Sequence, residues 1–134
     1  MPMVVVRNDI TRIEADAIVN PANRRLEHGN GTSDAIFQKA GAEKLAKACQ
    51  AIGSCQPGCA VATEGFDLPC KYIIHTVGPL YVDGGRGEEA LLRNAYLSAL
   101  KLAQAKGCQS IAFPLLSSGN MKYPKAEAMR VALT

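Results

Sequence analysis

The feature that most constrains this fold is a series of short apolar runs that alternate with helix-like segments. The runs are rich in β-branched residues and end at turn residues: "MVVVRN" (3–8), "DAIVNP" (16–21), "CAVATEG" (59–65), "KYIIHTVGP" (71–79) and "SIAFPLL" (110–116). Strands without polar alternation are buried on both faces, so helices must cover both sides of their sheet. The pattern therefore predicts an α/β fold, a three-layer α/β/α sandwich.

The segments between these runs have helical periodicity and helix-terminal residues. Helices are predicted over 32–41, where Thr32 or Ser33 can cap the start, over 42–53, and within 85–107 and 124–134. The first three end at a glycine. The third is the clearest, and one face of it carries Leu92, Ala95, Ala99 and Leu102.

Composition limits the classes of function. The 134 residues predict one domain, 1–134, and the absence of a long apolar run or leader peptide predicts a cytoplasmic protein without membrane contact. A net charge of +3 suits a small anionic ligand and makes nucleic acid an improbable partner. The five cysteines are expected to be free thiols. The spacing of the cysteines in "CQAIGSCQPGC" fits a structural zinc site poorly, so no metal is expected. No cofactor is expected either.

Polar loops follow two of the apolar runs and could hold phosphate. In "NPANRRLEHGNGTS", Gly29 and Gly31 allow a tight backbone before a helix start, whose N–H groups attract anions. After "SIAFPLL", the residues "SSG" (117–119) offer hydroxyl and N–H groups before another helix. Each loop could equally be a plain turn with a helix cap. Likewise, Asp9 could cap a turn or accept a hydrogen bond from an exocyclic amine such as that of adenine.

Four blocks in this order resemble the macrodomain family of ADP-ribose-binding domains: "RNDITRIEADAIVNPANRRL", "HGNGTSDAIFQKAG", "LPCKYIIHTVGP" and "SIAFPLLSSG". The resemblance runs from about Val4 to the end of the chain. It implies a mixed sheet, and because the family usually continues with a further strand and helix, we expect this domain to be C-terminally truncated relative to the family. An incomplete sheet would favour homo-oligomers.

The resemblance also implies roles for individual positions. Asp9, with Ile10 beside it, matches the acidic residue that reads the adenine amine, and Asn23 matches the asparagine that faces the distal ribose. The ligand-binding set that the resemblance implies is Asp9, Ile10, Asn20, Asn23, Gly29, Asn30, Gly31, Thr32, Ser33, Ser117, Ser118, Gly119, Asn120 and Met121. His75 lies in an apolar strand and is interpreted as a core residue.

The two loops depart from the pattern of hydrolytic family members. Ser33 stands where an aspartate is usual, and a serine hydroxyl is not ionised near neutral pH, so it cannot act as a carboxylate base. Asp34 follows it, in the position of a glycine. In the second loop Met121 replaces an aromatic residue and Lys122 a glycine.

Three functions remain open from the sequence. The first is binding of ADP-ribose or a related adenine diphosphate-ribose ligand. The second is hydrolysis of an ADP-ribosylated substrate or of O-acetyl-ADP-ribose, with Asn23 and Asp34 as the candidate catalytic residues. The third is a degenerate domain that acts only in association with other proteins.

Overall fold

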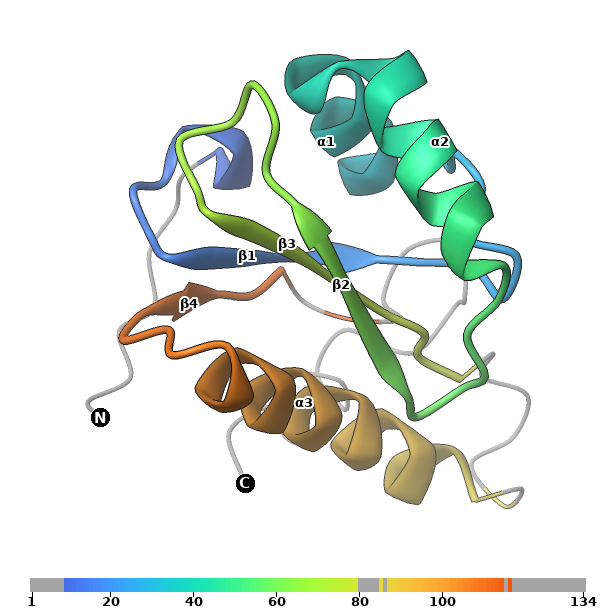
Figure 1. Cartoon of the computed structure of the whole chain (residues 1–134). Helices are drawn as coiled ribbons and strands as arrows, with labels where there is room; N and C mark the ends of the chain where they lie inside the picture. Colours follow the sequence, from blue (N-terminus) through green and yellow to red (C-terminus); the bar gives the residue numbers. More distant parts are fainter. Residues whose placement is uncertain (1–8, 80–84, 86, 115, 117–134) are drawn as a thin grey trace.

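The computed structural model describes residues 9–79, 85, 87–114 and 116 (Figure 1). The first described element is a short 3-10 helix, η1 (Ile10–Arg12), followed by strand β1 (Ala17–Pro21) and helices α1 (Thr32–Ala40) and α2 (Ala42–Ile52). Strands β2 (Ala60–Glu64) and β3 (Tyr72–Thr76), helix α3 (Glu88–Ala105) and strand β4 (Ile111–Ala112) complete it. The predicted strand 3–8 and the predicted helix 124–134 lie outside the described residues.

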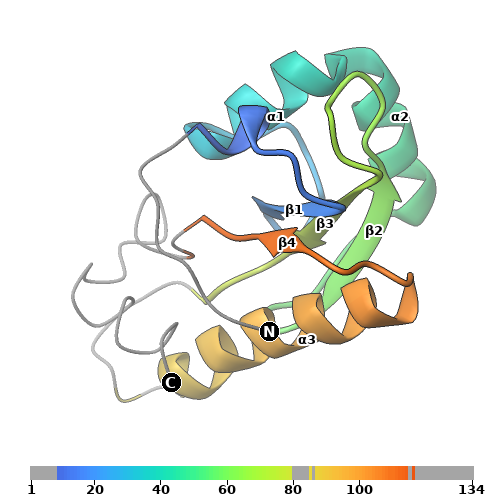
Figure 2. The ribbon, with the colours of Figure 1, turned by 90° about the vertical axis from the view of Figure 1, so that its left-hand side faces the viewer.

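The four strands form one mixed sheet in the order β2-β3-β1-β4. Strand β1 lies parallel to both β3 and β4, whereas β2 runs antiparallel to β3. Helices α1 and α2 cover one face and α3 covers the other, as Figure 2 shows. The predicted three-layer α/β/α sandwich with a mixed sheet is confirmed.

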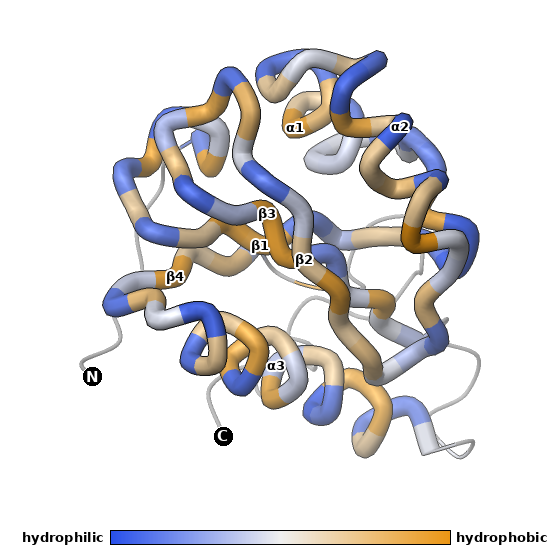
Figure 3. The backbone as a smooth tube through the Cα atoms, in the orientation of Figure 1, coloured by the Kyte–Doolittle hydropathy of each residue, from blue (hydrophilic) through white to orange (hydrophobic). Residues whose placement is uncertain are grey.

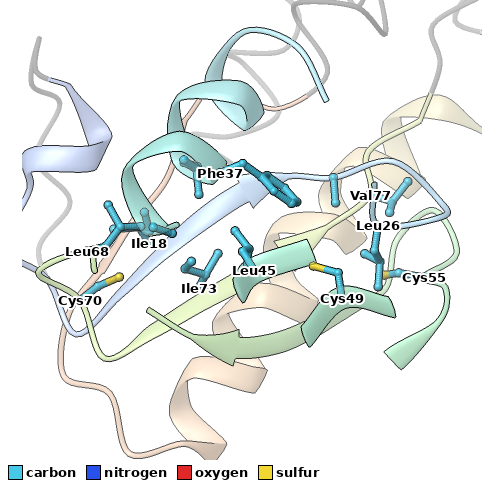
Figure 4. Close-up of a cluster of buried hydrophobic side chains, with 13 residues drawn as sticks. Ile18, Leu26, Phe37, Leu45, Cys49, Cys55, Leu68, Cys70, Ile73 and Val77 are labelled. Carbon is cyan, nitrogen blue, oxygen red and sulfur yellow. The ribbon is translucent and has the colours of Figure 1, made fainter. Parts of the chain in front are cut away.

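The two faces of the sheet support two separate clusters of apolar side chains. Ile18 and Ile73 point toward α1 and α2, where Phe37 and Leu45 are fully buried (Figure 4). Their sequence neighbours Val19 and Ile74 point the other way, against α3. Because both faces are covered, β1 and β3 are hydrophobic along most of their length in Figure 3.

Helix α3 packs on the sheet through small side chains. Leu92, Ala95 and Ala99 are fully buried, as the periodicity predicts. Leu102 is only partly buried, and Ala103 takes the last buried position on this face. Alanine lets the helix backbone approach the strands closely.

Strand β4 is shorter than the sequence predicts. The apolar run 110–116 suggests a strand along its whole length, but only Ile111 and Ala112 pair with β1. Pro114 has no N–H to donate, so the ladder cannot continue through it. Among the described residues, β1 therefore has a partner on this side only at Ala17 and Ile18.

Candidate functional site

The first predicted ligand loop connects β1 to α1, residues 22–31, at the carboxyl end of β1. At its start the loop is hydrogen-bonded to the sheet, where the Ala22 N–H donates to the carbonyl of Thr76 at 2.9 Å. A second hydrogen bond ties it to the segment after α2, where the Arg24 carbonyl accepts from the Cys55 N–H at 2.8 Å. Leu26, buried with a φ of 57°, turns the chain back toward α1. The loop thus has a defined path beside the sheet.

Asn23 organises the first half of this loop. Its Oδ1 accepts a hydrogen bond from the Glu27 N–H at 2.9 Å, and its Nδ2 donates to the Glu27 carbonyl at 3.2 Å. An asparagine amide has two donors and two acceptor positions, so one of each remains for a ligand. The side chain is partly exposed, which leaves it accessible.

The loop ends in a helix start suited to anions. Gly31 is the N-terminal cap of α1, with φ 60° and ψ −125°, and it has no side chain to cap the first turn. No described residue accepts a hydrogen bond from the N–H groups of Thr32, Ser33 or Asp34. Unpaired N–H groups and the positive end of the helix dipole attract negative charge.

Ser33 has a structural contact in this loop. It is 3% exposed, and its Oγ accepts a hydrogen bond from the Gly29 N–H at 3.3 Å. A Cβ on Gly29 would lie 3.2 Å from both Cβ and Oγ of Ser33. The glycine and the serine therefore fit against each other, and the hydroxyl at this position holds the loop.

Asp34 is paired with His28, a contact that the sequence analysis did not foresee. Its Oδ1 lies 2.7 Å from His28 Nε2, and the imidazole stacks on Phe37 with ring centroids 4.6 Å apart. Both side chains remain accessible, with 32% of His28 and 54% of Asp34 exposed. The sequence signal that could have indicated this contact is the position of His28 and Asp34 on either side of a glycine-containing turn that leads into a helix. The pair places a carboxylate and an imidazole at the start of α1.

Asn20, at the end of β1, lies below the loop in a buried polar row. Its Nδ2 donates to His75 Nδ1 at 2.9 Å, and His75 Nε2 lies 2.9 Å from Thr63 Oγ1. This pattern requires the neutral imidazole with its proton on Nε2. Burial lowers the pKa of His75 to about 4, so the ring is neutral at pH 7. His75 is a core residue that crosslinks three strands.

Among the described residues, Asn20 Oδ1 is the one buried side-chain nitrogen or oxygen atom without a hydrogen-bond partner. Asn20 is 1% exposed, and its side chain is buried in the sheet beneath the loop 22–31. Its role in ligand binding stays a prediction.

Asp9 precedes η1 and caps it. Its Oδ1 accepts from the N–H of Thr11 at 3.0 Å and from the Thr11 hydroxyl at 2.7 Å. These hydrogen bonds, with lesser help from Arg12 and Lys39, lower the pKa of the Asp9 carboxyl. Because Lys39 belongs to α1, Asp9 lies near the helix that follows the first loop. The interpretation of Asp9 as a cap is confirmed. Recognition of adenine by Asp9 and ligand binding by Ile10 stay predictions.

The second predicted loop, Ser117, Ser118, Gly119, Asn120 and Met121, lies outside the described residues, as does Lys122. Of the hollows on the described part of the chain, one lies beside β2 and another between α3 and β4, and these two are not lined by residues of the loop 22–31. All five cysteines are free, and the described residues contain no cluster of three metal-ligating side chains. No helix among them is long and apolar enough to span a bilayer.

A mixed sheet between helix layers, with a glycine-containing loop leading from a strand end to an uncapped helix, defines an α/β domain of the anion-binding class. A family model described as the Macro domain matches residues 19–132. The chain belongs to the macrodomain family.

Relatives and solved structures give the same assignment. The chain is 48% identical over 132 residues to the O-acetyl-ADP-ribose deacetylase of Cronobacter turicensis, covering 96% of this chain and 74% of that protein. It is also similar to the Oceanobacillus iheyensis macrodomain with ADP, with a TM-score of 0.89 and 41% identity over 94% of this chain and 70% of that one. The Trypanosoma brucei macrodomain in complex with ADP-ribose matches with a TM-score of 0.86 and 39% identity, over 95% of this chain and 52% of that one.

Proposed function

We propose that this chain binds ADP-ribose or a related adenine diphosphate-ribose ligand at the carboxyl end of β1. The observation that carries the proposal is the start of α1, where Gly31 leaves the N–H groups of the first turn without a side-chain cap. A phosphate is one of the anions that such a helix start accommodates. Asn23, near the start of the loop 22–31, keeps a donor and an acceptor for a ribose hydroxyl.

Family membership supports this choice of ligand. The structurally similar macrodomains include one with ADP and one with ADP-ribose. Asp9 is the expected partner of the adenine amine, since a carboxylate accepts hydrogen bonds and its lowered pKa keeps it ionised.

Calorimetric titration with ADP-ribose, AMP and ribose 5-phosphate tests the proposal. We expect Asp9→Ala to weaken binding of both adenine ligands by about tenfold, the worth of one charged hydrogen bond, with little effect on ribose 5-phosphate. Asp9→Asn is the matched control, because its Oδ1 can still cap η1. Equal losses for all three ligands would refute the assigned role. No heat with ADP-ribose at about 1 mM would refute the proposal and favour a domain that acts only by association.

We propose hydrolysis of an ADP-ribose derivative as the second function. The contact between Asp34 and His28, at 2.7 Å and accessible, supplies a carboxylate and an imidazole at the proposed ligand site. The similarity to O-acetyl-ADP-ribose deacetylases favours the same chemistry. In this scheme Asn23 orients the substrate, and Asp34 with His28 removes a proton from the attacking water.

Single-turnover release of acetate from O-acetyl-ADP-ribose tests this second function. We expect Asn23→Ala to abolish turnover and Asp34→Asn to lower the rate about 10²- to 10⁴-fold, the usual worth of a general base. Ser33→Ala is the control on the neighbouring position, which would lose a partly buried hydrogen bond but no titratable group. An unchanged rate in Asp34→Asn would exclude it as the base without bearing on ligand binding.

A further inference from the structure

Thr11 is a buried neighbour of the carboxylate that we expect to read adenine. It is 5% exposed and belongs to η1, the short helix that Asp9 precedes. Its N–H donates to Asp9 Oδ1 at 3.0 Å, and its hydroxyl donates to the same oxygen at 2.7 Å. A threonine has these two donors only. Both therefore converge on one oxygen atom of the Asp9 carboxylate.

The two hydrogen bonds to Oδ1 determine which side of the carboxylate can serve a ligand. Each oxygen of an ionised carboxylate offers about two acceptor positions. Thr11 fills both positions of Oδ1, so a ligand amine has to approach Oδ2. The Arg12 guanidinium lies 3.9 Å from Oδ2, which is longer than a hydrogen bond, and its side chain is 77% exposed. Such an exposed ion pair holds a carboxylate weakly, so Thr11 sets its orientation.

Helix η1 is itself held against the part of the molecule that contains the proposed ligand site. The side chain of Ile10 packs on the apolar cluster under α1 and α2. The short blue helix η1 lies close to α1 in Figure 2, and residues of the two helices are in contact. Helix α1 begins at the loop that carries the proposed phosphate site. A side chain that is fixed in η1 is therefore fixed relative to that loop.

The orientation of the Asp9 carboxylate is a source of selectivity between bases. The group is 47% exposed, and the torsion that turns an aspartate carboxylate is broad, so without support it would sample many orientations. Adenine presents an exocyclic amine, whereas hypoxanthine presents a carbonyl there and an N–H on the neighbouring ring nitrogen. A carboxylate that turns freely can accept from either base. A fixed one accepts only from the position that it faces.

We propose that Thr11 is a positioning residue for adenine selectivity, because it fixes the Asp9 carboxylate through Oδ1 so that Oδ2 accepts from the adenine amine. This inference rests on the proposed binding of an adenine ligand. The hydrogen bond from the Thr11 hydroxyl is also the largest cause of the lowered pKa of Asp9. The same contact thus favours the ionised carboxylate, which is the form that only accepts hydrogen bonds.

Calorimetric titration of Thr11→Val with AMP, inosine monophosphate (IMP, whose base is hypoxanthine) and ribose 5-phosphate tests the proposal. Valine keeps the branched Cβ and lacks the hydroxyl, while the backbone N–H can still reach Asp9. We expect the wild type to bind AMP about tenfold more tightly than IMP, the worth of one charged hydrogen bond. Thr11→Val should reduce this preference to about threefold or less. An undiminished preference in Thr11→Val, or equal binding of AMP and IMP by the wild type, would overturn the proposal.

Thr11→Ser is the matched control, because it keeps the hydroxyl and loses only a methyl group. Its preference for AMP should stay within about twofold of that of the wild type. Circular dichroism and an affinity for ribose 5-phosphate within about twofold of the wild type verify that both variants are folded. If Thr11→Ser lost the preference as Thr11→Val does, packing rather than the hydroxyl would set it, and the proposal would be wrong.

A double-mutant cycle determines whether Thr11 acts through Asp9. Asp9→Ala removes the carboxylate, so adding Thr11→Val to it should change the affinity for AMP by less than about 1.5-fold. In the wild-type background the same substitution should weaken AMP by about threefold. Equal effects in the two backgrounds would mean that Thr11 acts on the ligand by another route, which contradicts a positioning role.

NMR titration of the Asp9 carboxyl carbon gives a readout that needs no ligand. Thr11→Val should raise the pKa of Asp9 toward its ordinary value, whereas Thr11→Ser should leave it lowered. Arg12 of η1 and Lys39 of α1, the charged residues that also lower this pKa, are the same in both variants. An unchanged pKa in Thr11→Val would overturn the positioning role alone. A wild type that does not bind ADP-ribose would overturn the proposed function, and adenine selectivity with it.

Discussion

Asn20 and Asn23 lie three residues apart and have opposite environments. Asn20 is buried beneath the loop and bonds to His75, whereas Asn23 is partly exposed and bonds to the backbone of Glu27. The strand ends between them, at Pro21, so the first side chain belongs to the sheet and the second to the loop. The side-chain amide of Asn20 therefore crosslinks the strands beneath the loop, whereas that of Asn23 stabilises the shape of the loop itself.

The buried imidazole of His75 makes stability depend on pH. Its pKa is about 4 in the folded chain against an ordinary value of 6.5, because burial disfavours the charged ring. The unfolded chain binds the extra proton as pH falls below about 6.5, so stability is complete above that value and falls until about pH 4. We expect a loss of about 2 kcal/mol between pH 7 and pH 5 in urea denaturation.

His75→Gln is the control for this dependence. The glutamine variant will be less stable at every pH, but the difference in stability between pH 7 and pH 5 should shrink by about the same 2 kcal/mol. Identical pH slopes for the two proteins would contradict the buried neutral state of His75.

Gly31 has a backbone conformation that limits which residues can occupy this position. Its φ of 60° and ψ of −125° lie in a region that residues with a Cβ rarely adopt, although a Cβ there would meet no atom within 4 Å. We expect Gly31→Ala to lower the free energy of unfolding by about 1–3 kcal/mol through strain alone. The neighbouring exposed substitution Asn30→Ala should change it by less than about 0.5 kcal/mol, and thermal denaturation compares the two. Equal effects would mean that the backbone at Gly31 is not strained.

At the scale of elements, α3 shows how side-chain size sets the distance between layers. Ala95 and Ala99 are fully buried against the sheet and leave no room for larger groups. A leucine at such a site forces the helix away from the strands.

Ala99→Leu should therefore destabilise the fold by about 1–3 kcal/mol. Ala105→Leu makes the same change on the same helix at an exposed position, and it should cost less than about 0.5 kcal/mol. Urea denaturation of both variants measures the difference. If Ala99→Leu were as stable as Ala105→Leu, the close packing of α3 on the sheet would be wrong.

Elements with strong periodicity could be predicted from the sequence, and those that depend on tertiary contacts could not. Gly41 and Gly53 end α1 and α2 where the sequence predicts. The two-residue length of β4 depends on Pro114 and on pairing with β1, which an apolar run alone does not reveal. Similarly, "CAVATEG" does not show that β2 runs antiparallel to β3.

The candidate site divides in the same way. Local chemistry predicts a loop with Gly29 and Gly31 that leads into a helix. The contact of His28 with Asp34 depends on the path of the loop and on the Phe37 ring below it, and no periodic pattern encodes either. The row from Asn20 through His75 to Thr63 joins residues that are far apart in sequence, so only the sheet register brings them together.

At the scale of the whole molecule, the sheet separates two apolar clusters that share strands but not side chains. Ile73 and Ile74 are neighbours in β3, yet Ile73 belongs to the cluster under α1 and α2 and Ile74 to the cluster under α3. Ile18, which pairs with Ile73 across the β1–β3 ladder, belongs to the first cluster. All three are almost completely buried.

This arrangement predicts which truncations are energetically independent. Ile73→Val and Ile74→Val should each cost about 0.5–1.5 kcal/mol, and the double variant should cost their sum within about 0.5 kcal/mol. Ile18→Val with Ile73→Val should deviate from additivity by at least about 0.5 kcal/mol, because these side chains share one packed cluster. Urea denaturation of the five variants provides both cycles. Strong coupling between Ile73 and Ile74 would mean that strain passes through the β3 backbone from one helix layer to the other, and the two sides of the sheet would then respond as one core.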